Sequence, residues 1–140
     1  MSRIYLDSNL YVYYFEGHPE FGHLARSIVE RARQPQHRIF SSLFVLSELL
    51  VEPVRVKDEF RIASLNRFFR SDAVTLLPYA PEAVSIYASL RADHRVKPLD
   101  ALHLANAACA GTDLFITNDT ALKQLSVPGI GAIAGFDAQF

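Results

Sequence analysis

The stretch KPLDALHLANAACAG, residues 97–111, has the pattern of a helix that is apolar or small almost all the way round. Its polar interruptions are three residues apart and therefore share one helix face: Asp100, His103 and Asn106. We expect such a helix to be buried, so the carboxylate near its start needs a reason. One reason is local, because Asp is a favoured N-cap and the leucines around Asp100 would form a hydrophobic staple. The other reason is a functional site.

The composition is that of an ordinary globular chain. It has 140 residues, of which 50% are hydrophobic and 21% are charged, and this predicts a single domain over residues 1–140. The formal net charge of −1 gives no overall attraction to nucleic acid or anionic lipid. The lone cysteine excludes an internal disulfide, and no apolar run approaches a signal peptide or a membrane span. We therefore expect a cytoplasmic protein with no membrane partner.

Strand-like and helix-like segments alternate along the chain. Strands are predicted over residues 3–6, 38–42, 73–79, 114–117 and 130–135. Helices are predicted over residues 9–17, 20–33, 43–51, 57–70, 81–94, 97–111 and 119–125, with Pro53 interrupting after the third. The alternation predicts a three-layer α/β/α sandwich with a mostly parallel central sheet. In such sheets ligands bind outside the carboxyl ends of the strands.

Two acids lie at those predicted strand ends. Asp7 directly follows the first strand, and Asp119 lies two residues after the fourth. Each could be only the N-cap of the next helix. Short polar residues that can cap a helix, form a turn or orient a carboxylate flank both acids: Ser8, Asn9, Thr117 and Asn118.

A third acid, Glu48, lies inside the apolar segment LFVLSELLV of residues 43–51. A helix this apolar should be mostly buried, and an ionised carboxylate is unfavourable there unless it is paired or binds a metal ion. Two other placements are open: Glu48 faces solvent, or it pairs with an arginine.

The parallel-sheet prediction can bring four acids together: Asp7, Glu48, Asp100 and Asp119. Clustered carboxylates raise one another's pKa, and a hard divalent cation such as Mg²⁺ or Mn²⁺ relieves this repulsion. Zinc is disfavoured, because the histidines lack an HExxH arrangement and one cysteine cannot build a zinc site.

These acids and their surroundings resemble the PIN domain, a compact Mg²⁺/Mn²⁺-dependent nuclease fold. Within that family the chain is similar to VapC-type ribonuclease toxins of toxin–antitoxin pairs. The matching segments are IYLDSNLYVYYFEG, SSLFVLSELL, KPLDALHLANAACAG and LFITNDTAL, which run in the family order and cover nearly the whole chain.

The resemblance implies roles for the acids. Asp7 and Asp100 would hold the principal metal ion, Glu48 would complete the pocket through water or a second ion, and Asp119 would be the last acid of the set. The supporting polar positions would be Ser8, Asn9, Thr117 and Asn118. RNA hydrolysis would use a metal-activated water, so no protein nucleophile is needed. A Ser8–His103–Asp100 triad is disfavoured, because His103 is one turn from Asp100 in the same predicted helix and no nucleophile elbow motif is present. His103 is expected to be a helix residue near the site with a supporting role at most, and a structural role is favoured.

The resemblance also implies an RNA substrate, a small VapB-type antitoxin whose C-terminal segment covers the site, and a homodimer. Basic residues that could line a groove for phosphates, or form only a solvated face, fall into two groups: Arg55, Lys57, Arg61, Arg67 and Arg70, and then Arg91, Arg95 and Lys97. Of the aromatic residues in segment 11–15, we expect two in the core and the others in a partner groove: Tyr11, Tyr13, Tyr14 and Phe15.

Two other classes of function stay open. A phosphotransferase of the haloacid-dehalogenase type also places an Asp after its first strand. It requires a second Asp two residues later, where this chain has Asn9. A non-catalytic PIN module that binds RNA or acts as a scaffold is opposed only by the intact set of acids.

Overall fold

Five parallel strands form one sheet at the centre of the computed structural model, which describes all of residues 1–140. The strands are β1 (Ser2–Leu6), β2 (His37–Ser41), β3 (Val74–Leu76), β4 (Thr112–Ile116) and β5 (Ile130–Ala134). Their order across the sheet is β3-β2-β1-β4-β5, and every neighbouring pair is parallel. The predicted sheet is confirmed. The third strand is shorter than the predicted segment 73–79.

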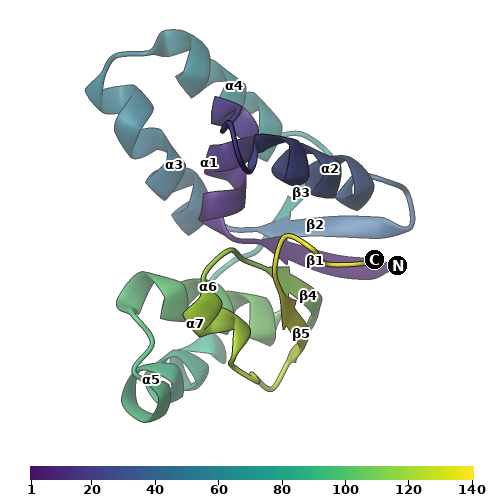
Figure 1. The fold of residues 1–140 in the computed structure, drawn as a ribbon. Helices are drawn as coiled ribbons and strands as arrows, with labels where there is room; N and C mark the ends of the chain where they lie inside the picture. Colours follow the sequence, from purple (N-terminus) through teal and green to yellow (C-terminus); the bar gives the residue numbers. More distant parts are fainter.

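Seven helices cover the two faces of this sheet. They are α1 (Ser8–Glu16), α2 (Gly22–Ala32), α3 (Leu43–Arg55), α4 (Glu59–Phe69), α5 (Ala83–His94), α6 (Pro98–Cys109) and α7 (Thr120–Lys123). Helices α1 to α4 lie on one side of the sheet and α5 to α7 on the other (Figure 1). The predicted three-layer α/β/α sandwich is therefore confirmed. None of the helices is long and apolar enough to cross a lipid bilayer.

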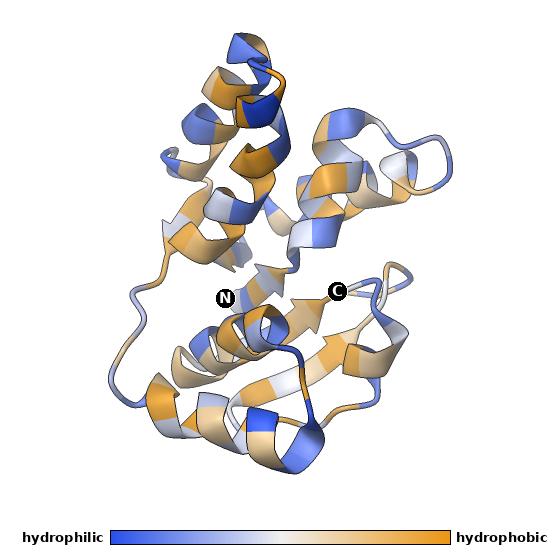
Figure 2. Cartoon of the chain, turned by 90° about the vertical axis from the view of Figure 1, so that its left-hand side faces the viewer, coloured by the Kyte–Doolittle hydropathy of each residue, from blue (hydrophilic) through white to orange (hydrophobic).

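The hydrophobic core lies on both sides of the central strands. Thirty buried apolar residues form one cluster, which includes Ile4, Tyr5 and Leu6 of β1. Helices on both faces remove these side chains from water, which is why β1 is a continuous apolar run rather than an alternating one. Figure 2 shows the same distribution, with hydrophobic strands inside and hydrophilic positions on the outer helices.

Helix α6 begins differently from the N-cap prediction for Asp100. Lys97 is the N-cap and Pro98 the first helical residue, so Asp100 lies inside the first turn. The residue before a proline is forced into extended backbone, and Lys97 has ψ 150°. Proline itself is suited to the first helical position because its missing N–H has no helical partner there. The prediction that Asp100 caps this helix is wrong.

Helix α3 also departs from its predicted bounds, because it continues through Pro53 to Arg55. The proline lacks one N–H near the carboxyl end of the helix, and it is buried. At the other end Ser42 caps the helix, with its hydroxyl accepting a hydrogen bond from the Val45 N–H at 3.4 Å.

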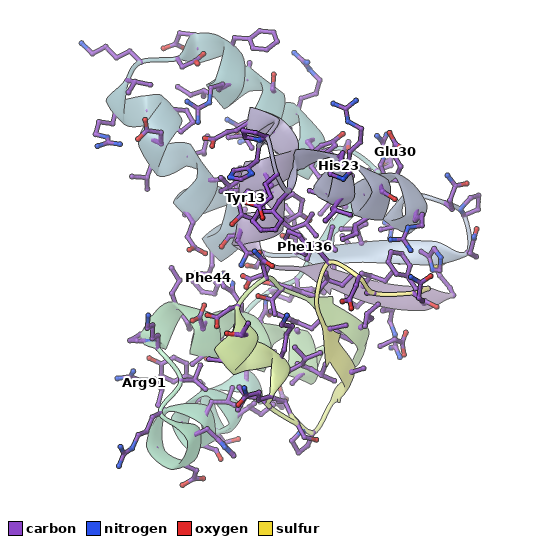
Figure 3. The ribbon with its side chains drawn as sticks, in the orientation of Figure 1. Tyr13, His23, Glu30, Phe44, Arg91 and Phe136 are labelled. Carbon is purple, nitrogen blue, oxygen red and sulfur yellow. The ribbon has the colours of Figure 1, made fainter.

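The aromatic segment of α1 is less buried than expected. Tyr11 is fully buried, whereas Tyr13, Tyr14 and Phe15 are half-buried and pack against the edge of the core. The ring of Tyr13 lies beside that of Phe136, with centroids 5.7 Å apart (Figure 3). One of the four residues, not two, is in the interior.

Candidate active site

The site lies where β1 and β4 end. These strands are neighbours with Leu6 opposite Ile116, so the residues that follow them emerge at one edge of the sheet. The Asp7 N–H donates to the Ile116 carbonyl at 2.9 Å. The two predicted strand-end segments are thus joined by backbone contacts before any side chain is considered.

Thr117 joins the polar side chains at this edge. Its fully buried hydroxyl donates to Asp7 Oδ2 at 2.7 Å and accepts from the Asp119 N–H at 3.1 Å. The Asn9 amide nitrogen lies 3.5 Å from the hydroxyl oxygen of Thr117. The two strand-end acids therefore share one hydroxyl group that fixes their separation.

Asp7 is almost completely buried, with 4% of its surface exposed. Burial raises the pKa of Asp7, and the charge of Glu48 adds to the rise; the Thr117 hydroxyl, the His103 ring and the Ser8 N–H oppose it. Asp7 also caps α1, since its Oδ1 accepts from the Ser8 N–H at 2.8 Å. Capping occupies one oxygen in part and leaves acceptor capacity on both.

Asp100 approaches the same place from the first turn of α6. Burial raises the pKa of Asp100, and the nearby charges of Asp7, Asp119 and Glu48 raise it further. The nearby His103 ring opposes the rise, and no hydrogen bond does. All four predicted acids thus interact electrostatically, although they come from four separate places in the chain.

Glu48 is held by a histidine, so it neither faces solvent alone nor pairs with an arginine. His103 Nε2 lies 2.5 Å from Glu48 Oε1, and the two side chains are 1% and 28% exposed. On the other side of the ring, His103 Nδ1 lies 3.3 Å from the Tyr5 hydroxyl. Sequence reasoning missed this contact; its only signal was that His103 and Asp100 share a helix face. With both ring nitrogens engaged in this way, His103 does not activate Ser8.

The remaining predicted residues complete the edge of the site. Asp119 caps α7, with its Oδ1 accepting from the Ala121 N–H at 2.9 Å. Ser8 contributes its backbone N–H, and Asn9 has a buried side-chain oxygen with no hydrogen-bond partner. Asn118 is half-buried between Thr117 and Asp119.

The donor set fits a hard cation better than a zinc ion. Free acceptor capacity is on carboxylate oxygens and on the orphan Asn9 oxygen. Of the two histidines nearby, His103 already contacts Glu48, and His94 is an exposed residue of the hollow that Asp100 and Asp119 line. No three His, Cys, Asp or Glu side chains are arranged as a ready set of ligands. Mg²⁺ needs no such set, since it is commonly held by one or two carboxylates with water and substrate phosphate.

Two hollows flank the acids. One, of about 240 Å³, lies between α1, α3 and α4 and is lined by Glu48 together with apolar side chains such as Phe15 and Phe60. The other, of about 210 Å³, is lined by residues 94–97, Asp100, Asp119 and part of α7. Glu48 therefore lines the apolar groove, whereas Asp100 and Asp119 line the smaller hollow.

The predicted basic residues divide into paired and free ones. Arg61 pairs with Glu16 at 2.6 Å and lies 4.0 Å from Asp58, and Arg55 pairs with Glu52. Arg55 is exposed, whereas Arg61 is half-buried and lines the hollow between α1, α3 and α4. Arg95 and Lys97 are exposed and form no ion pair.

Comparison with known proteins places this geometry in a family. The PIN-domain model matches residues 4–128, whereas no curated protein matches the chain. Among solved structures, VapBC2 from Rickettsia felis bound to promoter DNA has 20% identity and a TM-score of 0.75, and the match covers 95% of this chain and 98% of the other. DNA-bound VapBC from Salmonella typhimurium has 21% identity, coverage of 97% and 99%, and a TM-score of 0.75.

A third structure is VapC20 from Mycobacterium tuberculosis, described as a sarcin-ricin loop cleaving toxin. It has 16% identity and a TM-score of 0.64, and the match covers 80% of this chain and 86% of the other. These likenesses show the shared fold. The family match leaves no place for the haloacid-dehalogenase alternative. Over nearly its whole length, from Ile4 to Pro128, the chain belongs to the PIN-domain family.

Proposed function

We propose that this chain is an endoribonuclease that depends on Mg²⁺ or Mn²⁺ and acts as the toxin of a VapC-type pair. The observation that carries the proposal is the gathering of acids at the joined ends of β1 and β4: the carboxylate of Asp7 and the N–H of Asp119 share the Thr117 hydroxyl, and Asp119 lines the same hollow as Asp100. The charges of Asp7, Asp119 and Glu48 add to the rise that burial causes in the pKa of Asp100, and a bound cation relieves such repulsion. The PIN-domain fold and the RNA-cleaving description of one structural neighbour support RNA as the substrate.

The residues divide the work of such a site. Asp7 and Asp100 would hold the cation, with Glu48 and Asp119 acting directly or through water. When bound, the cation supplies a Lewis acid for the phosphodiester and lowers the pKa of a coordinated water. The Thr117 hydroxyl keeps Asp7 and Asp119 in fixed relative positions. The near-complete burial of Asp7 excludes bulk water from its carboxylate.

A VapB-type antitoxin and a homodimer are the proposed partners. The apolar hollow between α1, α3 and α4 opens beside Glu48 and carries Phe60, which is 80% exposed. A segment with an apolar face fits this groove and would end next to the acids. The VapBC neighbours, which pair a toxin with an antitoxin, support the same assignment.

Cleavage of single-stranded RNA by the purified full chain tests the proposal. We expect cleavage with Mg²⁺ or Mn²⁺, none with EDTA, and no rescue by Ca²⁺, whose looser coordination suits this chemistry poorly. An Asp7→Asn variant purified in parallel is the control for contaminating nucleases, because Asn can still cap α1. Equal cleavage by parent and variant, or full cleavage in EDTA, contradicts the proposal.

A further inference from the structure

A line of buried polar contacts connects the two helical layers through the sheet. Glu48 is on α3, Tyr5 on β1 and His103 on α6, so each layer contributes one residue. His103 contacts Glu48 Oε1 at 2.5 Å and the Tyr5 hydroxyl at 3.3 Å. The Tyr5 hydroxyl in turn lies 3.1 Å from the hydroxyl of Ser42, the N-cap of α3. The line therefore begins at Glu48 of α3 and ends at Ser42, the N-cap of the same helix.

The inner members of this line have little freedom to move. Tyr5 and His103 are 0% and 1% exposed. The Tyr5 ring stacks on Phe115 of the neighbouring strand, with centroids 5.2 Å apart and planes within 6°. Close packing of this kind holds side chains in single rotamers. The imidazole ring is therefore a rigid support for whatever it contacts.

Glu48 alone would lack such rigidity. Its side chain is 28% exposed and lines the hollow between α1, α3 and α4, so its carboxylate has room to rotate. An ionised carboxylate only accepts hydrogen bonds, so in that state Nε2 of His103 is the donor of the 2.5 Å contact. The contact uses Oε1, and Oε2 is left without a protein partner.

We propose that His103 is a positioning residue: it holds Glu48 Oε1 so that Oε2 is presented to the divalent cation or to its bound water. This inference rests on the proposed function and extends it to a residue outside the acid set. Outer partners that orient a metal-binding side chain typically change metal affinity or activity by about 10–100-fold when removed.

Two amide substitutions at His103 separate its two contacts. In His103→Gln the amide nitrogen reaches the place of Nε2, so the donor to Glu48 is kept. In His103→Asn the shorter amide keeps a polar group near the Tyr5 hydroxyl but does not reach Glu48. If His103 had only a structural role, the effects of the two substitutions would depend on how well each side chain packs and not on whether it donates to Glu48.

The measurement is Mn²⁺ affinity, by electron paramagnetic resonance titration of the full chain, alongside kcat and KM for RNA cleavage. We expect His103→Asn to weaken Mn²⁺ binding about tenfold or more and to lower kcat, with little change in KM for RNA. His103→Gln should restore most of the affinity. Equal effects of the two variants, or unchanged affinity in a folded His103→Asn protein, would overturn the assignment.

A double-mutant comparison isolates the route through Glu48. If His103 acts by orienting that carboxylate, His103→Asn should have no further effect on Mn²⁺ affinity in a Glu48→Gln background. A full additional loss there overturns the proposal. Tyr5→Phe is the second probe if His103→Asn does not fold; it should weaken Mn²⁺ binding in the same direction, and an unchanged affinity overturns the proposal as well.

Failure of the proposed function gives a different pattern. A folded parent chain that neither binds Mn²⁺ nor cleaves RNA overturns both claims together. A parent that binds and cleaves while its His103 variants behave alike overturns the positioning role alone.

Discussion

At the scale of single residues, the hydroxyl of Thr117 is the group that the strand-end acids share. It donates to Asp7 and accepts from the Asp119 N–H, and no water can replace it easily because it is fully buried. We predict that Thr117→Val lowers the free energy of unfolding by about 1–3 kcal/mol, because buried polar partners are left unsatisfied. RNA cleavage should fall about tenfold or more.

Thr117→Ser is the matched control, since it keeps the hydroxyl and removes only a methyl group. Chemical denaturation and a cleavage assay on the same preparations check the prediction. Near-identical results for the Val and Ser variants would show that the hydroxyl does not organise the site.

The raised pKa values of Asp7 and Asp100 predict how metal-free stability depends on pH. A carboxyl group whose pKa is higher in the folded than in the unfolded state binds its proton more tightly when folded. Its ionised form therefore destabilises the fold at neutral pH, and the penalty disappears as pH falls through the raised pKa toward the ordinary value of 3.8. We expect the contribution of these acids to make the metal-free chain more stable on acidification over that window.

Melting temperature against pH in EDTA measures this effect. Asp100→Asn removes one of the two groups, so its melting temperature should rise less on acidification than that of the parent. Added Mg²⁺ should stabilise the parent less as pH falls, because protons compete for the same oxygens. Parallel curves for parent and variant would contradict the assignment of the shift to Asp100.

At the scale of elements, the sequence predicted the alternation of strands and helices because the apolar segments differ in length and periodicity. It also predicted that Asp7 and Asp119 would meet at one edge, because parallel strands end on the same side. The predicted helix over 97–111 begins within one residue of α6, but the alternative in which Asp100 caps it fails, because Pro98 takes the first helical position and Lys97 the cap. The Glu48–His103 contact could not be read from the chain, since it joins helices on opposite faces of the sheet and residues 55 positions apart.

The junction between α6 and β5 gives a prediction for an element boundary. Gly129 has φ +97°, and a Cβ there would lie 2.4 Å from the Ala108 carbonyl oxygen at the end of α6. Gly17, the C-cap of α1, has φ +63° and open space around it. We predict that Gly129→Ala lowers the free energy of unfolding by roughly 2 kcal/mol or more. Gly17→Ala should lower it by about 1 kcal/mol, because only the backbone preference of glycine is lost there. Equal losses in urea denaturation would show that the contact with Ala108 is unimportant.

At the scale of the whole molecule, the distribution of free positive charge around the acids predicts how RNA binds. The turn between α5 and α6 is fixed by buried Val96, whose carbonyl accepts from Arg91 at 3.2 Å. Arg95 and Lys97 flank Val96 in the sequence, and both line the smaller hollow together with Asp100. We predict that Arg95→Ala/Lys97→Ala raises KM for RNA with little change in kcat, and reduces the salt dependence of binding by about one to two phosphate contacts.

The matched control uses two arginines that lead into the opposite edge of the sheet. Arg33 and Arg70 are exposed residues that follow α2 and α4 and precede the starts of β2 and β3. The structure thus places Arg70, a candidate for phosphate contact on sequence grounds, at the edge of the sheet opposite the acids. Their double alanine variant carries the same loss of charge away from the acids. If both double variants raise KM equally, RNA binding depends on the net charge of the protein and not on Arg95 and Lys97 in particular.

The central claim is that the acids form a cation site for RNA cleavage, and Asp100→Asn tests it most directly. Asn has nearly the same size as Asp but no charge, so the substitution removes one of the carboxylates that repel one another. The melting temperature of the metal-free protein should therefore hold or rise. Stabilisation by Mg²⁺ should shrink, because linkage follows affinity.

Melting with and without Mg²⁺, together with RNA cleavage on the same preparation, gives the result in one experiment. We predict a folded protein whose cleavage is reduced on the order of a hundredfold or more, with a diminished response to Mg²⁺. Retained cleavage with an unchanged Mg²⁺ response would contradict the account.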